Sequence, residues 1–165
     1  MDLVLKQAAY AEEQPYSRAI LITHVIHRGF NMWSILGTGA TLAWAGYQRP
    51  PLSTLYPSLL AGAARGGIFG LGFGALAVTG RMWGRDLVEW QDRSWRLLGH
   101  ATQNSTDHWS LVGAAAGAIA SGTVYASTAK QLSMGTRLVG GAALGSTLGI
   151  VAMLASRPLL KAPKA

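Results

Sequence analysis

The apolar residues of this chain are gathered into long blocks, and polar residues separate one block from the next. A helix needs about 20 apolar residues to cross a bilayer, and four blocks reach or approach that length. We therefore predict an all-α integral membrane protein, a single membrane domain over residues 1–165 with about four transmembrane helices. The predicted spans are residues 31–47, 57–80, 109–127 and 135–156.

The first predicted span is the shortest, and a continuation of the helix predicted over Ala19–Phe30 would lengthen it. Two interpretations of that preceding region stay open: an interfacial helix, or the first part of one long span. Arg49-Pro50-Pro51 is predicted to end the span, because consecutive prolines cannot continue a helix. Pro57 is expected to open the second span in its first turn. So short a link makes the two spans antiparallel neighbours.

Small residues recur every fourth position in the apolar blocks, so each run falls on one face of a helix. In a soluble helix each glycine costs about 1 kcal/mol relative to alanine, which leaves a soluble glycine-rich bundle as the minor alternative. In lipid, small residues four apart let helix backbones approach closely. The predicted helix-packing residues are Gly62, Gly66, Gly70, Gly74, Gly113, Gly117, Gly141, Gly145 and Gly149, and a weaker run is Gly39, Ala43 and Tyr47.

Residues 81–108 differ from the blocks on either side, because charged and aromatic residues alternate there. Trp83, Leu87 and Trp90 fall on one helical face, and charged residues fill the others. We predict an amphipathic linker helix that lies either on the membrane surface or against a soluble partner. Gln103–Asp107 is predicted to be a polar loop, with Thr106 or Asp107 as the cap of the third span.

Charge and composition narrow the class of protein. Charged residues make up 13% of the chain, the formal net charge is +7, and there is no cysteine, which excludes disulfides. The N-terminal residues resemble neither a secretory signal nor an arginine-rich transit peptide, so targeting is expected to be internal. Basic residues flank the spans rather than cluster with stacking aromatic residues, so the expected partner is anionic phospholipid such as cardiolipin, and not nucleic acid.

The distribution of Lys and Arg predicts orientation. Ten lie in the terminal segments and the central linker and three in the two opposite connections, which places both termini on the matrix or cytoplasmic side. Arg65 is the one charged residue set inside an apolar block, and its side chain either snorkels to the interface or pairs with a partner group. The arginines expected to contact lipid or partner subunits are Arg65, Arg81, Arg85 and Arg157.

Candidate chemistry is sparse. His24 and His27 lie one helical turn apart, but no further ligand is expected near them, so a structural role is favoured over a metal site. Gly70–Gly74 has the glycine spacing of a nucleotide loop, yet it neither follows a strand nor opens a crossover helix. No serine, histidine and acid group suggests a catalytic triad, and no pair of carboxylates lies within the predicted spans. We therefore predict no catalytic, cofactor-binding or metal-binding residues.

The glycine runs Gly62–Gly74, Gly113–Gly117 and Gly141–Gly149 resemble the four-span mitochondrial inner-membrane translocase (Tim) family and the respiratory complex I accessory subunits of the same form. The segment Trp83–Trp109 is similar to a small fungal-type accessory membrane subunit of complex I. This resemblance implies a non-catalytic subunit of the mitochondrial inner membrane, packed among the membrane-embedded subunits of NADH:ubiquinone oxidoreductase. The alternatives are a component of a protein translocase and a small membrane protein acting in transport. A Tim-like protein would place its termini in the intermembrane space, opposite to the charge count.

Overall fold

The computed structural model describes residues 6–123, 127 and 129–160, the last four as backbone only. In these residues a 3-10 helix, η1 (Ala11–Glu13), precedes α1 (Ser17–Gln48), α2 (Leu52–Met82), α3 (Leu87–Leu98), α4 (Ala101–Gly122) and α5 (Met134–Leu160), and there is no strand. The prediction of an all-helical chain is therefore confirmed.

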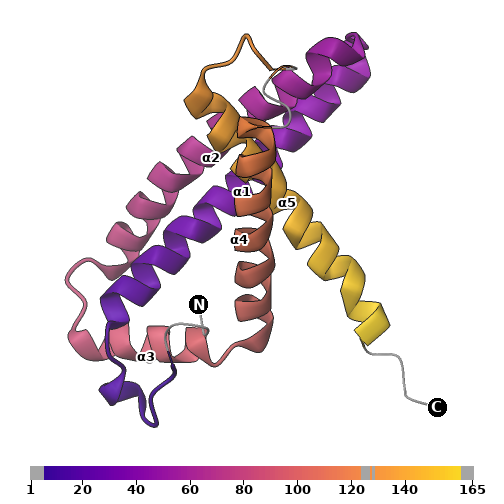
Figure 1. The fold of residues 1–165 in the computed structure, drawn as a ribbon. Coiled ribbons are helices and arrows are strands. Elements are labelled where there is room, and N and C mark those ends of the chain that lie inside the picture. Colours follow the sequence, from indigo (N-terminus) through magenta and orange to yellow (C-terminus); the bar gives the residue numbers. More distant parts are fainter. Residues whose placement is uncertain (1–5, 124–126, 128, 161–165) are drawn as a thin grey trace.

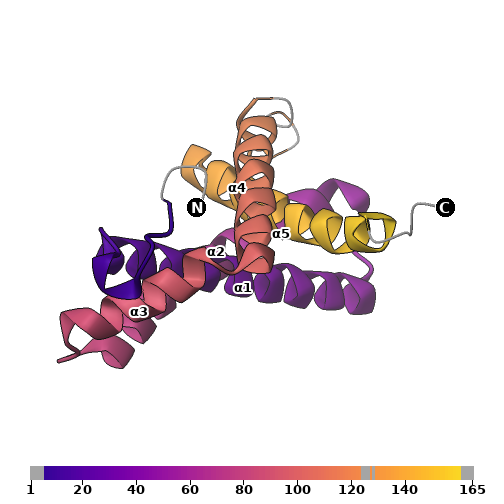
Figure 2. The same ribbon diagram turned by 90° about the horizontal axis from the view of Figure 1, so that it is seen from below.

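The four long helices form two pairs (Figure 1). α1 packs along α2, α4 packs along α5, and the pairs meet mainly where α5 crosses α2. The short helix α3 lies across one end of the molecule, beside the start of α1, as Figure 2 also shows. We call this the α3 end. The opposite end, which carries the α1–α2 turn and the α4–α5 connection, is called the turn end.

Helix α1 is longer than the predicted span because residues 17–30 continue into it without a break. Its 32 residues correspond to about 48 Å of helix. The helix ends where Arg49 adopts a left-handed conformation with φ 49°, directly before Pro50 and Pro51. The predicted lengthening of this helix by residues 19–30 is therefore confirmed.

Helix α2 begins at Leu52, not at Pro57 as predicted. Pro57 is the sixth residue of the helix and is buried. A proline there removes only the N–H that would reach the carbonyl of Ser53. Since Ser53 is exposed close to the helix end, solvent or a headgroup can satisfy that carbonyl, and the helix tolerates the proline.

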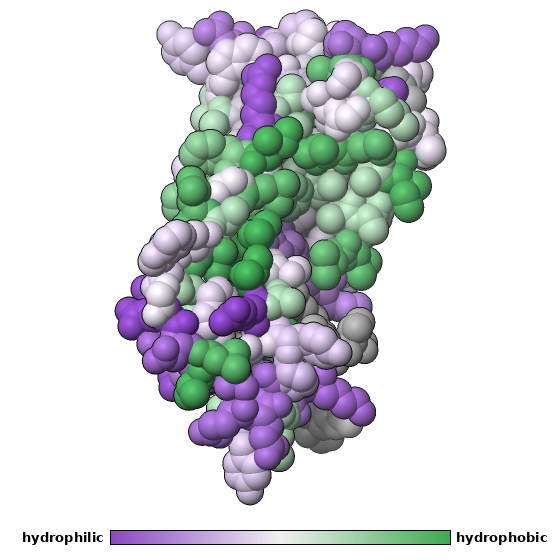
Figure 3. Space-filling model, turned by 90° about the vertical axis from the view of Figure 1, so that its left-hand side faces the viewer, coloured by the Kyte–Doolittle hydropathy of each residue, from purple (hydrophilic) through white to green (hydrophobic). Residues whose placement is uncertain are grey.

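Two of the described helical stretches, Leu52–Met82 and Met134–Ser156, are long and apolar enough to cross a membrane by length and composition. In the most apolar 18-residue stretch of each helix, only 33% and 39% is buried, whereas the core helix of a soluble protein is mostly buried. Apolar side chains gather in a belt on the face shown in Figure 3, and polar residues dominate at the α3 end. The other predicted spans, 31–47 and 109–127, lie largely in the more polar α1 and α4.

The predicted loop at Gln103–Asp107 is wrong, because these residues form the first turns of α4. Their polar side chains find partners inside the protein. Asn104 Nδ2 donates to the Leu98 carbonyl at 2.7 Å, and Thr106 Oγ1 donates to the Thr102 carbonyl at 2.9 Å. The polar composition of this segment predicts a loop, but these hydrogen bonds satisfy the polar side chains while the segment stays helical.

The amphipathic linker is confirmed as a helix only over Leu87–Leu98. Its buried residues, Ser94, Leu97 and Leu98, face the rest of the chain, and Leu97 and Leu98 pack with Ile20 of α1. Trp95 Nε1 also donates to the Ala8 carbonyl at 2.8 Å. The inner face of α3 is thus covered by other parts of this chain. The prediction had placed the helix on the membrane surface or against a soluble partner, and had not included this contact.

Candidate functional site

The glycines of α2 lie against the backbone of α1. A Cβ added to Gly70 would meet the Gly29 carbonyl oxygen, and one added to Gly66 would meet the Trp33 carbonyl oxygen. Gly74 lies against Val25 and Ile26, and Gly62 lies against Thr41. No side chain fits between backbones at this separation, so the pair depends on glycine here.

The same arrangement joins α4 to α5. A Cβ on Gly113 would meet the carbonyl oxygen of Gly145, and one on Gly117 would meet that of Gly141. Gly149 lies against the Trp109 carbonyl in the same way. All nine glycines predicted for helix packing thus face a helix of their own chain. Gly140, which was not predicted, lies against Leu60 where α5 crosses α2.

On α1 the predicted small-residue run is wrong. Gly39 has open space beside it, and Ala43 and Tyr47 are exposed. The contact with α2 is instead made by residues at the same four-residue spacing but in another register, namely Gly29, Trp33, Gly37 and Thr41. Trp33 was missed because the glycine opposite approaches its backbone carbonyl, and Thr41 was missed although Gly62 lies against its side chain.

A buried polar cluster joins α1, α4 and α5, and it is the feature that the sequence analysis missed. It contains His24, His27, Arg28 and Asn31 of α1, Asp107 and Ser110 of α4, and Ser146 of α5. Asp107 is 1% exposed, and the hydroxyls of Ser110 and Ser146 are fully buried. We call these seven residues the polar cluster.

Asp107 is the centre of the polar cluster. Its Oδ2 lies 2.9 Å from His24 Nδ1, and its Oδ1 lies 3.2 Å from Arg28 Nη2 and 3.7 Å from His27 Nδ1. Arg28 Nη2 also donates to the Gln103 carbonyl at 3.3 Å. Three cationic or potentially cationic groups of α1 therefore converge on one carboxylate of α4, which lowers the cost of burying its charge.

Asn31 extends the polar cluster to the third helix. Its Nδ2 lies 3.2 Å from His27 Nε2 and donates to Ser110 Oγ at 3.2 Å, and its Oδ1 accepts from Ser146 Oγ. Ser110 Oγ also lies 3.1 Å from His27 Nε2. The polar groups are thus used within the bundle, as expected of a structural polar network.

No further ligand was expected near His24 and His27, yet the carboxylate of Asp107 lies beside both. Even so, no three His, Cys, Asp or Glu side chains among the described residues are arranged to hold a metal ion. Arg28 also stands at the same carboxylate and would repel a cation. The geometry favours a helix-joining role for the two histidines.

A sequence signal for the polar cluster did exist. His24, His27 and Asn31 follow a spacing of three and four, and Asp107 and Ser110 are three apart, so each set falls on one helical face. What the spacing does not show is that the two faces meet, since they are separated by about 80 residues of chain, as in the 83-residue separation of His24 and Asp107.

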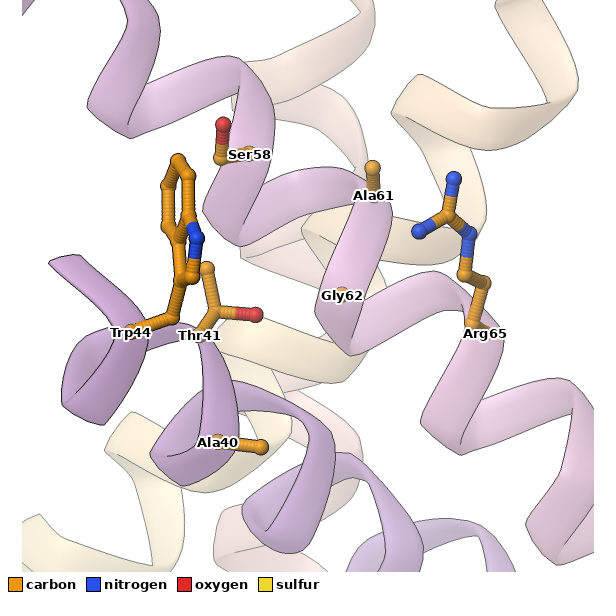
Figure 4. A pocket seen from close by; sticks show the side chains of 7 residues that line it. All are labelled: Ala40, Thr41, Trp44, Ser58, Ala61, Gly62 and Arg65. Atoms are coloured by element: carbon orange, nitrogen blue, oxygen red, sulfur yellow. The ribbon is translucent and has the colours of Figure 1, made fainter. Parts of the chain in front are cut away.

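The predicted lipid-contacting or partner-contacting arginines have different surroundings. Arg85 is exposed and pairs with Glu89 at 3.2 Å on the same surface, and Arg81 is exposed at the α3 end of α2. The side chain of Arg157 lies outside the described residues. Arg65 is exposed in the half of α2 that is nearer the turn end, and it borders a hollow between α1 and α2 (Figure 4).

No protein-family model matches this chain, and no curated protein matches it.

Proposed function

We propose that this chain is a non-catalytic accessory subunit of a mitochondrial inner-membrane complex, in which it holds neighbouring helices and lipids in place. The observation that carries the proposal is the division of its surfaces. Glycines and polar groups are used inside, between the helices of the chain, while large apolar side chains face outward. Such a molecule is rigid within itself and offers its exterior to lipid or to other apolar helices.

The outward apolar side chains are distributed over all four long helices. Each helix has several that are more than a third exposed. They include Met32, Ile35 and Leu36 on α1, Ile68, Phe69 and Leu76 on α2, Leu111 and Ile119 on α4, and Leu148, Val151 and Leu154 on α5. We infer that α1 and α4 cross the membrane together with α2 and α5, so that the chain spans it four times with the α3 end on one side.

The polar start of α4 has a role in this proposal. Its first ten residues are largely polar, which leaves only about 12 apolar residues in the helix, too few to cross a bilayer alone. Because Asp107 and Ser110 bond to α1, part of that polar segment lies within the bundle, shielded from lipid. A helix of this kind needs close neighbours in order to be held in the membrane.

We assign the complex as NADH:ubiquinone oxidoreductase on the resemblance of residues 83–109 to a small accessory subunit. The alternative, a translocase component, would need polar positions along a pathway. The candidates were Ser121, Thr123, Ser146 and Thr147. Ser121 Oγ lies 3.0 Å from Tyr56 Oη and Ser146 donates to Asn31, while the hydroxyls of Thr123 and Thr147 donate to carbonyls of their own helices. The accessory role is therefore the better supported of the two.

Native electrophoresis of mitochondria solubilised in a mild detergent tests this assignment. We expect the tagged chain to migrate in a large band that contains flavin and oxidises NADH, and mass spectrometry of the band should identify the neighbouring subunits. Migration with trapped precursor polypeptides would replace the assignment with the translocase alternative. Migration as a free protein under conditions that keep the complexes intact would remove both.

A further inference from the structure

Arg65 borders a hollow between α1 and α2 that the described side chains of this protein leave unfilled. The hollow has a volume of about 400 Å³ and is lined by Ala40, Thr41 and Trp44 of α1 and by Ser58, Ala61 and Gly62 of α2, together with Arg65. Figure 4 shows the guanidinium turned back toward Ala61, with Trp44 and Ser58 on the far side. The guanidinium of Arg65 therefore lies at a hollow whose other lining residues, apart from Trp44, are small.

The polar groups of the hollow are suited to an anion. The guanidinium fork and the Ser58 hydroxyl can donate to phosphate or carboxylate oxygens, and the hollow has no acidic side chain. The Thr41 hydroxyl already donates to the Gly37 carbonyl at 2.8 Å. Ala40, Ala61 and Gly62 leave apolar space beside these donors, in which glycerol and the first carbons of an acyl chain would fit.

The anion has to come from outside the chain. The sequence contains no Asp or Glu between Glu13 and Asp86, and none after Asp107. No described residue forms an ion pair with Arg65, and the described acids with ionic partners all lie in α3 or at Asp107. The turn end therefore carries cations only, among them Arg49, Lys130 and Arg137.

The position of Arg65 along α2 favours a lipid phosphate. It lies 16 residues from Arg81, or about 24 Å of helix, a little less than the hydrocarbon thickness of about 30 Å. Arginine stems on an α-helix point toward its N-terminus, which for Arg65 is the turn end. The charge thus reaches the level at which phosphates lie, and the nearby Trp44 is the kind of residue found at that level.

We propose that the hollow beside Arg65 binds the phosphate of an anionic phospholipid in the leaflet at the turn end, with the guanidinium and Ser58 as donors. This rests on the proposed membrane location. The lipid then fills the hollow between α1 and α2 and gives the turn end the negative charge that the chain lacks.

Native mass spectrometry of the full chain, delipidated in detergent and titrated with phosphatidylglycerol, tests the site. Recovery of the unaltered protein in the membrane fraction is scored first, because its failure would refute the proposed function independently of the site. We then expect Arg65→Gln to weaken phosphatidylglycerol binding by about tenfold, and Arg65→Lys to weaken it less. Arg96→Gln, which changes an exposed arginine of α3 that pairs with Asp92 at 2.8 Å, is the control and should leave binding unchanged.

Two further arms separate the sources of the anion. Ala61→Phe fills the hollow without changing charge and should also weaken lipid binding, whereas inorganic phosphate at the lipid concentration should not displace the lipid. Equal effects of Arg65→Gln and Arg96→Gln would overturn the proposal, and so would displacement by inorganic phosphate. If Arg65→Gln keeps full lipid binding but no longer enters its complex, the partner is a protein carboxylate and the lipid site is refuted.

Discussion

Asp107 is the residue through which α1 and α4 contact each other near the α3 end. The two helices bridge there with side chains, since His24, Arg28 and Asn31 reach across to Asp107, the Gln103 carbonyl and Ser110. A buried carboxylate in this position contributes only while its cationic partners are present. Removing one partner leaves an uncompensated group in a poorly hydrated place, which costs more than the original bond gained.

Asp107→Asn is the variant that tests the polar cluster. It keeps the shape of the side chain but removes the charge that His24 and Arg28 face, so we expect the free energy of unfolding to fall by about 2 kcal/mol. The measurement is thermal or denaturant unfolding in detergent. Asp92→Asn is the matched control, because Asp92 pairs with Arg96 at 2.8 Å on an exposed surface, where such pairs contribute about 0.5 kcal/mol. Equal losses in both variants would contradict a central role for Asp107.

At the scale of the helix, the close approach of α1 and α2 depends on position within one turn. Gly70 lies against the Gly29 carbonyl, whereas Gly72, two residues later on the same helix, has open space beside it. Both are glycines of an apolar helix and differ only in the face on which they lie. Gly70 belongs to the four-residue run of glycines and Gly72 does not. Gly72 therefore serves as a control position on the same helix.

We therefore expect Gly70→Leu to destabilise the protein by about 1–3 kcal/mol, because leucine would force the two backbones apart. Gly72→Leu should change stability by no more than about 0.5 kcal/mol. Unfolding in detergent measures the difference, and carbonate extraction should show that both variants still insert, since leucine favours the membrane. If Gly72→Leu were as damaging as Gly70→Leu, the two faces of α2 would not differ in the way the structure shows.

At the scale of the molecule, the long helices alternate in direction between the α3 end and the turn end (Figure 1). The two ends differ in charge, since Glu89 and Asp92 lie in α3 among arginines, while the turn end has no described acid. A four-span arrangement would therefore expose a mixed-charge surface on one side of the membrane and a purely cationic surface on the other.

Single-cysteine labelling in sealed vesicles tests that arrangement, and the native chain has no cysteine to compete. Gln48→Cys and Ser127→Cys place a thiol in each connection of the turn end, and Thr102→Cys places one at the α3 end; all three side chains are exposed. We expect an impermeant reagent to reach the first two from the same side and Thr102→Cys from the other. Labelling of Gln48→Cys and Ser127→Cys from opposite sides would rule out four spans.

The helical character of the chain can be predicted from the sequence alone, and so can the glycine runs of α2, α4 and α5 that lie against another helix. Apolar blocks and four-residue spacing are local properties, so they specify which helix forms and which face of it has no side chains. Predictions from local patterns can also be wrong when side-chain partners decide the structure. The polar residues of Gln103–Asp107 read as a loop, because the sequence does not show that their side chains have partners within a helix.

Which helix faces meet is a property of the folded chain that local patterns do not contain. The tertiary structure paired α1 with α2 and α4 with α5, put Gly29 and Gly37 on the contact face in place of Gly39, and brought His24 to Asp107 across 83 residues of chain. The physical reason is that burial and hydrogen bonding depend on distances between helices, and these are set by how whole helices cross. A carboxylate that reads as a helix cap in the sequence became the centre of a buried cluster because a second helix supplied its partners.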